Sequence, residues 1–539
     1  MIQRKIKKKL QRKIKEESIN KSLQRSWKNA MPLSNTQIWE LTTSNSWIYV
    51  VALIFLYVIY ILRNYIRLVK ITLSLDGPPA LPLIGNIHYY FKPNVMNEMK
   101  KYSTYNIIRL WVTFIPYLAI IQPEDIQIIL SSSKHTRKPF VYSLFRNVIG
   151  KGLTINDGEA SKMHRNIIQK AFNVHGLEKF AEIFVEHAEY LTSVLRDIVN
   201  QDMNITKLIN DVIYNIQAET VLGLKLIKEN KKNNETCELP FKVNEMFASY
   251  RFKRPWLLFE SLYKLTKKSQ IDKQQLDNNI AYCYDIIKKI EKSKRLNSYD
   301  MTNDETQTEN GRMSLLEFMV NMKQKYSYFN DEAILNECST FMLAGLESVS
   351  TATACMLFLL ANHSECQKKC VDELDEIYNN NATLTSFKSL KEMKYLEMCI
   401  KETLRLYPVI PVIARCLTED IKIGGRIIPT GTSVLISPYL THRIPRYYLD
   451  PESFKPERFD PQNSTEKLHP YAYIPFSAGP KNCIGYKFAI LEMKVLVSSI
   501  LRNFVLEPIA NKNKIYVKYR MTLRAQGGLW IKFRLRKTM

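Results

Sequence analysis

The chain has 539 residues, 46% hydrophobic and 24% charged, which is the composition of a globular protein with a large core rather than of a disordered one. Its 77 Lys and Arg against 52 Asp and Glu give a formal charge of +25, which alone permits nucleic acid, an anionic membrane or an acidic protein as partner. The nine cysteines are odd in number and form no paired C-x-x-C clusters, so a disulfide framework or zinc ribbon is disfavoured and a reducing, cytosol-facing environment is favoured.

Residues 1–46 form a basic N-terminal extension, whose first 30 positions carry cations against only Glu16 and Glu17. We hypothesise that translation begins at Met31, which would leave a nearly uncharged leader. A mitochondrial transit peptide and a solvated basic tail are the alternatives, and the uncharged run that follows argues against import into the matrix.

Residues 47–62 (WIYVVALIFLYVIYIL) carry no charge and have Trp and Tyr near their ends, which predicts a transmembrane anchor; a buried core helix is the alternative. Arg63, Arg67 and Lys70 follow immediately, so the positive-inside rule predicts that the downstream body faces the cytosol. Residues 63–86 end in a proline-rich stretch and are expected to form a basic, proline-rich hinge.

Residues 87–539 show no internal repeat and are expected to form one large domain, mainly α with small β-sheets. Two apolar runs, 107–113 and 117–121, predict a hairpin that turns at Pro116. The strongest helix candidate runs from Asn330 to Asn362. Surface loops are predicted at 227–236, 297–312 and 379–383.

The segment from Phe476 to Gly485 reads FSAGPKNCIG and precedes a helical pattern from Tyr486. A cysteine just ahead of a helix has its thiolate stabilised by free backbone N–H groups and by the helix dipole. We expect Gly479 and Gly485 to let the backbone turn tightly beside a flat cofactor, with Phe476 packed next to it.

This segment resembles the F-x-x-G-x-x-x-C-x-G signature of the cytochrome P450 family. The resemblance implies the cytochrome P450 fold and a haem b whose iron takes its axial thiolate from Cys483, the one metal ligand we expect. The family usually has Arg where this chain has Lys481, and that residue binds a haem propionate. Lys keeps the charge but loses the bidentate fork.

Two further segments, around Glu402-x-x-Arg405 and Arg458, match the Glu-Arg-Arg network that holds the thiolate loop in the family. By itself an E-x-x-R pair is most often a solvated salt bridge. The resemblance implies that Glu402, Arg405 and Arg458 are structural rather than catalytic.

The sequence Ala344-Gly345-Leu346-Glu347-Ser348 resembles the family's A/G-G-x-D/E-T element over the distal face of the haem. Oxygen activation needs two protons, for which Glu347 and Ser348 would be the acid and the alcohol, while Gly345 would leave room for oxygen. Ser348 replaces the usual Thr, so we expect somewhat leaky oxygen activation with release of hydrogen peroxide. Taken alone, this segment is an unremarkable helix fragment.

Arg165 and Arg415 match family positions that contact the haem propionates, and Ser161 takes the place of the usual tryptophan. A surface location is the alternative for Arg165. Together with Lys481, Ser161 makes two propionate contacts that the resemblance predicts to be weakened.

The chain is most similar to the family 4 microsomal enzymes, particularly those of insects. Many of these have a Glu at the place of Ala344 that can esterify the haem, so here we expect noncovalent haem. The stretches that carry this likeness are Arg254-Pro255-Trp256, Thr340-Phe341-Met342 and Thr441-His442-Arg443.

The resemblance implies a monooxygenase that inserts one oxygen atom from O2 into a lipophilic substrate, such as a fatty acid, hydrocarbon or terpenoid. No flavin or dinucleotide fingerprint is recognisable, so electrons would come from NADPH through the separate NADPH-cytochrome P450 reductase, with cytochrome b5 as a possible second donor. The expected location is the endoplasmic reticulum membrane, with no nucleic-acid partner. The alternatives are a haem-binding protein with weak or no monooxygenase activity, and a peroxide isomerase or dehydratase.

Overall fold

The structure is a computed structural model, and it describes residues 46–92, 94–226, 250–297, 313–378, 386–462, 468–520 and 522–536. Met31 and the three expected loops lie outside these residues, except that Asn297 ends a helix. The chain divides into two compact units between Val69 and Lys70.

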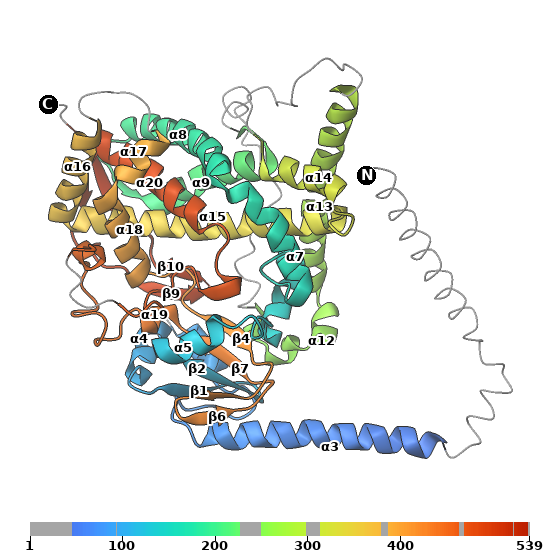
Figure 1. The fold of residues 1–539 in the computed structure, drawn as a ribbon. Coiled ribbons are helices and arrows are strands. Elements are labelled where there is room, and N and C mark those ends of the chain that lie inside the picture. Colours follow the sequence, from blue (N-terminus) through green and yellow to red (C-terminus); the bar gives the residue numbers. More distant parts are fainter. Residues whose placement is uncertain are drawn as a thin grey trace, which may run out of the picture. The chain divides into compact units, whose positions relative to one another are not determined.

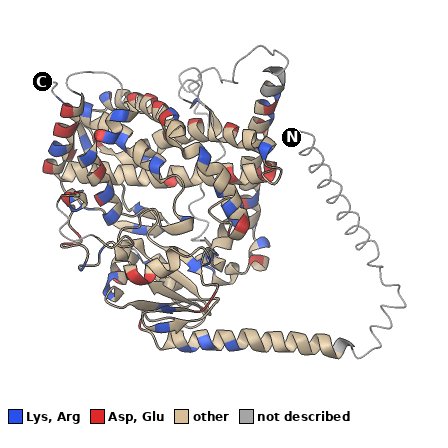
Figure 2. Ribbon diagram, viewed as in Figure 1, with Lys and Arg blue, Asp and Glu red and all other residues tan. Residues whose placement is uncertain are grey.

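The hydrophobic run near the N-terminus forms α3, a single helix over Ser46–Leu73. Its stretch Ile48–Leu73 has a mean hydropathy of 1.9 and is long and apolar enough to cross a membrane. The helix continues past the predicted end of the anchor through Arg63, Arg67 and Lys70, because nothing before the prolines at 78 and 79 interrupts it. Figure 2 shows these cations confined to one half of α3, so the first part of the expected hinge is helical.

The second unit is mainly helical (Figure 1), as expected. Its α-helices are α4 (Val95–Met99), α5 (Pro123–Leu130), α6 (Arg146–Ile149), α7 (Gly158–Ile168), α8 (Val174–Arg196), α9 (Ile205–Leu222), α12 (Glu260–Lys264), α13 (Lys267–Asn297), α14 (Leu315–Lys325), α15 (Asp331–Asn362), α16 (Ser364–Tyr378), α17 (Phe387–Glu392), α18 (Lys394–Leu406), α19 (Pro438–Thr441) and α20 (Tyr486–Asn503).

Helix α15 is the central element of this unit, and it confirms the helix predicted from Asn330 to Asn362. Asn330 caps it by accepting a hydrogen bond from the backbone N–H of Ala333 at 2.9 Å. The helix is apolar enough to pass as a membrane span, but most of it is buried against α9, α18 and α20, which is the situation of a core helix. In Figure 1 it runs across the molecule between the α8–α9 layer and the sheets.

The largest sheet has the order β1-β2-β7-β4, formed by β1 (Ile107–Val112), β2 (Ile115–Ile120), β7 (Ser433–Ile436) and β4 (Ile413–Cys416). The predicted hairpin is present, but Pro116 lies inside β2 opposite Trp111 rather than in the turn. The turn is made by Thr113, which has a φ of 56°, and Phe114. Proline is tolerated there because the pairing of β2 with β7 begins only at Tyr117.

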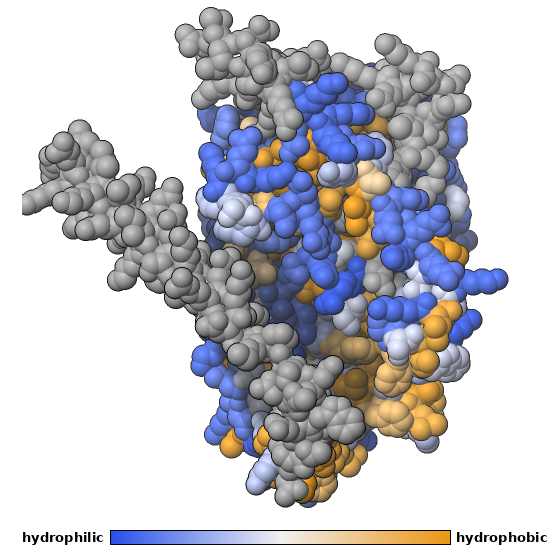
Figure 3. Space-filling model, turned by 90° about the vertical axis from the view of Figure 1, so that its right-hand side faces the viewer, coloured by the Kyte–Doolittle hydropathy of each residue, from blue (hydrophilic) through white to orange (hydrophobic). Residues whose placement is uncertain are grey.

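Three smaller sheets complete the fold. Their strands are β3 (Asp202–Asn204), β11 (Trp530–Leu535) and β8 (Phe504–Pro508) in one sheet, β9 (Val517–Arg520) and β10 (Thr522–Ala525) in the second, and β5 (Ile421–Ile423) and β6 (Arg426–Ile428) in the third. The main core lies between α8, α9, α15, α18 and α20. Figure 3 shows that hydrophobic residues are also present at the surface, among hydrophilic ones.

Candidate functional site

A cavity of about 760 Å³ lies beneath α15, and most of its lining is apolar or aromatic. Segments that are distant in the chain meet around it: the α7 region, the middle of α15, strand β4, the loop before α20 and the β9–β10 hairpin. Of the residues expected at the cofactor and at the catalytic position, those that line it are Gly345, Glu347, Ser348, Arg165, Phe476, Lys481 and Cys483.

Cys483 lies two residues before Gly485, the N-cap of α20, as predicted. Its backbone N–H donates to the carbonyl of Phe476 at 2.9 Å, which closes the loop on itself. The side chain is enclosed by the protein, and its exposed surface faces the cavity that it lines. Burial raises the pKa of the thiol, whereas the backbone N–H of Gly485 and the charge of Arg165 lower it. The last two groups are those that would stabilise a thiolate in complex with a metal.

The two glycines of this loop have different reasons to be glycine. A Cβ on Gly485 would meet nothing within 4 Å, so the absence of a side chain leaves the backbone open to close approach. Gly479 has a φ of +69°, and a Cβ on it would lie 1.8 Å from the carbonyl oxygen of Leu130. Gly479 thus lets the loop pack on α5 and does not line the cavity, and its expected place beside the cofactor stays a prediction.

Arg165 links α7 to the cysteine loop. Its guanidinium donates to the backbone carbonyl of Asn482 at 2.7 Å and also to the side-chain oxygen of that residue. Lys481 contacts the start of the same helix and the residues before it, because its Nζ donates to the hydroxyl of Ser161 and, at 2.9 Å, to the carbonyl of Asn156. Ser161 at the expected tryptophan position thus holds the lysine at the expected arginine position.

The acid and the alcohol of α15 both line the cavity but are engaged with different partners. Glu347 accepts from Arg524 of β10, at 2.7 Å from Nε and also from a terminal nitrogen, and from the hydroxyl of Thr522 at 2.5 Å. Ser348 donates to the carbonyl of Ala344 at 2.7 Å, a bond within the helix.

Gly345 has a different neighbour from the one expected. A Cβ at this position would lie 2.5 Å from the side-chain amide of Gln217 on α9. The absence of a side chain at Gly345 thus leaves room for the flexible amide end of Gln217, and its expected role in leaving room for oxygen stays a prediction. Sequence reasoning missed Gln217, because its position depends on how two remote helices pack.

Comparison with known proteins decides which family this site belongs to. The model of the family described as "Cytochrome P450" matches residues 75–531. The chain is 40% identical over 481 residues to "Probable cytochrome P450 4aa1" of Drosophila melanogaster, covering 88% of this chain and 92% of that protein. It is 33% identical to "Cytochrome P450 4V2" of Mus musculus, covering 85% of this chain and 89% of that protein. The chain belongs to the cytochrome P450 family. It is a haem-thiolate monooxygenase with haem b as cofactor, and its relatives include the insect family 4 protein "Cytochrome P450 4c3" of Drosophila melanogaster at 30% identity.

The cations at one edge of the cavity fit the propionates of such a haem. Burial, with the charges of Arg415 and Arg165 adding to it, lowers the pKa of Lys481 to about 8, although Asp157 opposes the shift. Burial and the neighbouring cations also hold the pKa of Lys138 well below its usual value. Like charges gathered at one edge of the cavity would be stabilised by an anionic ligand, and two carboxylates would supply it.

Two of these cations differ in their relation to the cavity. Arg415 is buried, donates to the carbonyl of Ala414 at 2.9 Å and does not itself line the cavity, so its expected contact with a propionate stays a prediction. Its guanidinium lies 3.5 Å from the hydroxyl of Ser477, which does line it. Lys138 lines the cavity directly and was missed, because no motif surrounds it in the sequence.

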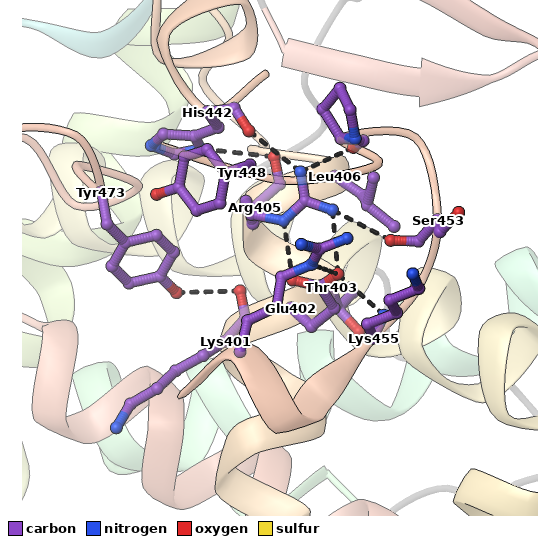
Figure 4. Close-up of polar contacts among 12 residues, drawn as sticks. Lys401, Glu402, Thr403, Arg405, Leu406, His442, Tyr448, Ser453, Lys455 and Tyr473 are labelled. Carbon is purple, nitrogen blue, oxygen red and sulfur yellow. Dashed lines mark hydrogen bonds and ion pairs between the residues drawn. The ribbon is translucent and has the colours of Figure 1, made fainter. Parts of the chain in front are cut away.

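The predicted network around Glu402 is present and buried (Figure 4). Glu402 accepts from Arg405 at 2.7 and 2.8 Å, from Arg458 at 3.3 Å and from the backbone N–H of Lys455 at 2.9 Å. Arg405 also donates to three backbone carbonyls, from Nη1 to those of His442 and Pro451 and from Nη2 to that of Ser453. All of this satisfies a buried ion pair, and it ties α18 to the loops that precede the cysteine.

Proposed function

We propose that this enzyme inserts one oxygen atom of O2 into a long lipophilic substrate, such as a fatty acid, a hydrocarbon or a terpenoid. What supports the proposal most strongly is the grouping of Cys483, the pair Glu347 and Ser348 and an anion-demanding edge around one cavity. The side chains that line this cavity are predominantly apolar, which suits a substrate without multiple charges. They include Val95, Met96, Val141, Phe145, Leu153, Phe252 and Val412.

Each residue of the site has a proposed role. Cys483 would be the axial thiolate. The propionates would be bound by Arg165, Lys481 and Lys138. Arg415 would support this edge indirectly, through its hydrogen bond to Ser477. Haem held by a thiolate supplies the chemistry of O–O cleavage. Glu347 would hold and deliver protons. Ser348 would help to direct these protons once its hydroxyl no longer donates to the carbonyl of Ala344.

The partners follow from what the chain lacks and from its N-terminal helix. The sequence shows no recognisable flavin or dinucleotide fingerprint, so electrons would come from NADPH through the separate reductase, with cytochrome b5 as a second donor. Helix α3 and the cations at its C-terminal half favour a membrane-bound enzyme whose catalytic unit faces the cytosol, in the endoplasmic reticulum.

The test is the carbon monoxide difference spectrum of the dithionite-reduced full chain in detergent. We expect a far-red-shifted Soret band in the wild type and its loss in Cys483→Ala, with Cys355→Ala as a matched control because that buried thiol does not line this cavity. Reconstitution with the reductase and a panel of fatty acids, alkanes and terpenoids then tests the substrate class. The proposal fails if the wild type folds without binding haem, or if haem binds but no panel member gives oxygenated product.

A further inference from the structure

Glu337 is a fully buried acid on α15 that the proposed chemistry does not use. One of its carboxylate oxygens lies 2.8 Å from Nδ1 of His164 on α7. The other accepts at 3.0 Å from the backbone N–H of Leu153, which belongs to the α6–α7 loop (residues 150–157). The two oxygens of this acid therefore bind groups from two different segments of the chain.

The charge of Glu337 also acts on the edge of the main cavity. Burial raises the pKa of Glu337, while the bonds to its two partners and the charge of Lys481 oppose the shift. Glu337 in turn opposes the shift that lowers the pKa of Lys481. This acid is therefore close enough to the proposed propionate edge to influence its cations.

The α6–α7 loop is fastened to α15 at more than one point. Asn336, the neighbour of Glu337, accepts from the backbone N–H of Lys151 at 2.7 Å. A Cβ on Gly152 would lie 2.8 Å from the backbone carbonyl oxygen of Asn336, so the loop passes the helix backbone too closely for any other residue. The bond from Glu337 thus belongs to a tight contact between the loop and the helix.

The two segments that Glu337 joins form different parts of the site. Leu153 and Ile155 of the loop line the main cavity, where a lipophilic ligand would lie. Arg165 directly follows His164 on α7 and lines the proposed propionate edge. One buried carboxylate therefore connects a wall for the ligand with a binding edge for the haem.

We propose that Glu337 is a positioning residue that holds the cavity wall and the propionate edge in place together, so that it sets both ligand affinity and haem retention. This inference rests on the proposed propionate edge. The bond to Leu153 fixes the loop, and the bond to His164 orients the turn of α7 that carries Arg165. Loss of one bond should release only the segment that it holds, whereas loss of the carboxylate should release both.

Two measurements on the haem-loaded full chain in detergent follow the two parts separately. The rate of haem transfer to excess apomyoglobin reports haem retention. A spectral titration with 1-octylimidazole, whose alkyl chain must enter the cavity, reports the ligand wall. In Glu337→Gln we expect haem transfer to become about tenfold faster and the dissociation constant to rise about fivefold, because a carboxamide has one acceptor oxygen for two donors.

Single-bond variants separate the two segments. His164→Leu should speed haem transfer while changing the dissociation constant by less than about twofold. Asn336→Ala loosens only the loop, so it should weaken 1-octylimidazole binding while changing haem transfer by less than about twofold. Glu332→Gln is the matched control, because it makes the same substitution at an exposed acid of the same helix, and both readouts should stay at the wild-type values.

Urea unfolding distinguishes positioning from general stability. If Glu337→Gln lowers the free energy of unfolding but the folded enzyme keeps both wild-type readouts, the role of Glu337 is structural and the proposal is wrong. A change in only one readout would also overturn it. If Glu337→Gln does not fold, His164→Leu and Asn336→Ala carry the test, since each must move its own readout alone.

Lys481→Met separates failure of this inference from failure of the proposed edge. If Lys481→Met does not speed haem transfer, the proposed propionate edge is wrong, and this inference fails with it. If Lys481→Met speeds haem transfer but Glu337→Gln does not, the edge stands and only the role of Glu337 is wrong. We expect both variants to speed it, and only Glu337→Gln to weaken 1-octylimidazole binding as well.

Discussion

At Ala344 a single side chain decides how the haem is held. Its methyl group faces the main cavity next to Gly345, and no carboxylate is present there to form an ester. We expect acidified butanone to extract all the haem from the wild type after turnover. The variant Ala344→Glu should retain a covalently bound fraction, and intact-protein mass spectrometry measures it. A haem adduct on the wild-type chain would contradict noncovalent binding.

His442 makes the stability of the enzyme depend on pH. It is fully buried, its Nε2 accepts from the N–H of Ile474 at 2.8 Å, and burial together with Arg443 and Arg405 lowers its pKa to about 3. Below the unfolded value of about 6.5 the unfolded state binds a proton that the folded state does not, so stability is complete above pH 6.5 and declines as pH falls toward 3.

The predicted slope from His442 approaches 1.4 kcal/mol per pH unit between pH 6 and pH 4. Urea unfolding of His442→Gln over the same range should show a slope smaller by about that amount, although the variant is less stable at pH 7. An identical slope in the two proteins would show that His442 does not set the pH dependence.

At the scale of elements, α18 and the loops before the cysteine are joined through one arginine. Arg405 makes all its hydrogen bonds in a site with no solvent exposure, so removing it leaves Glu402 buried with only Arg458 and a backbone N–H. We expect Arg405→Met to cost about 3–5 kcal/mol of unfolding free energy and most of the bound haem.

Arg405→Lys is the informative companion, because it keeps the charge but cannot reach three carbonyls and both oxygens of Glu402. It should be intermediate in denaturant midpoint and in haem content per chain. Arg536→Met, which removes a largely surface pair with Asp375, is the control and should change stability by less than about 1 kcal/mol. Equal effects of the two arginines would contradict the structural role of the network.

How far sequence could predict the elements depended on whether their signals were local. Motifs of residues close together in the chain predict the cysteine loop, α15 and the E-x-x-R helix. The structure has all three where they are expected. The role of Arg524 could not be predicted, because strand β10 reads as an ordinary polar segment and meets Glu347 only through an approach of residues 177 positions apart. The turn of the first hairpin was predicted at the wrong residue for a related reason. Proline usually indicates a turn, but Pro116 is accommodated inside β2 because the pairing with β7, far along the chain, begins only after it.

For the whole molecule, the division at Val69 predicts what a truncation does. The second unit contains the cavity, the cysteine loop and the core, and α3 contributes mostly to the first. A chain that starts at Lys70 should therefore keep the reduced carbon monoxide spectrum of the full-length enzyme. Flotation with liposomes should show that it loses most of its membrane association, whereas the full chain floats.

Exposed hydrophobic side chains on the second unit should leave the truncated chain with some membrane association. Trp256, Phe259 and Leu265 are all more than half exposed. A double variant, Trp256→Ser with Phe259→Ser, should remove residual flotation of the truncated chain. If the truncated chain that carries both replacements still floats as well as the full chain, α3 is not the main anchor.

The contact between Ser161 and Lys481 makes the residues acceptable at these two positions, 320 residues apart, depend on each other. A tryptophan at 161 would occupy the space in which the lysine ammonium now lies, leaving the carbonyl of Asn156 as its remaining acceptor. Changing Ser161 to Trp alone should therefore be unfavourable, whereas changing Lys481 to Arg at the same time gives the pair that the family resemblance implies. In closely related chains these two positions should be inherited as one character, and intermediates that mix the two states should be rare.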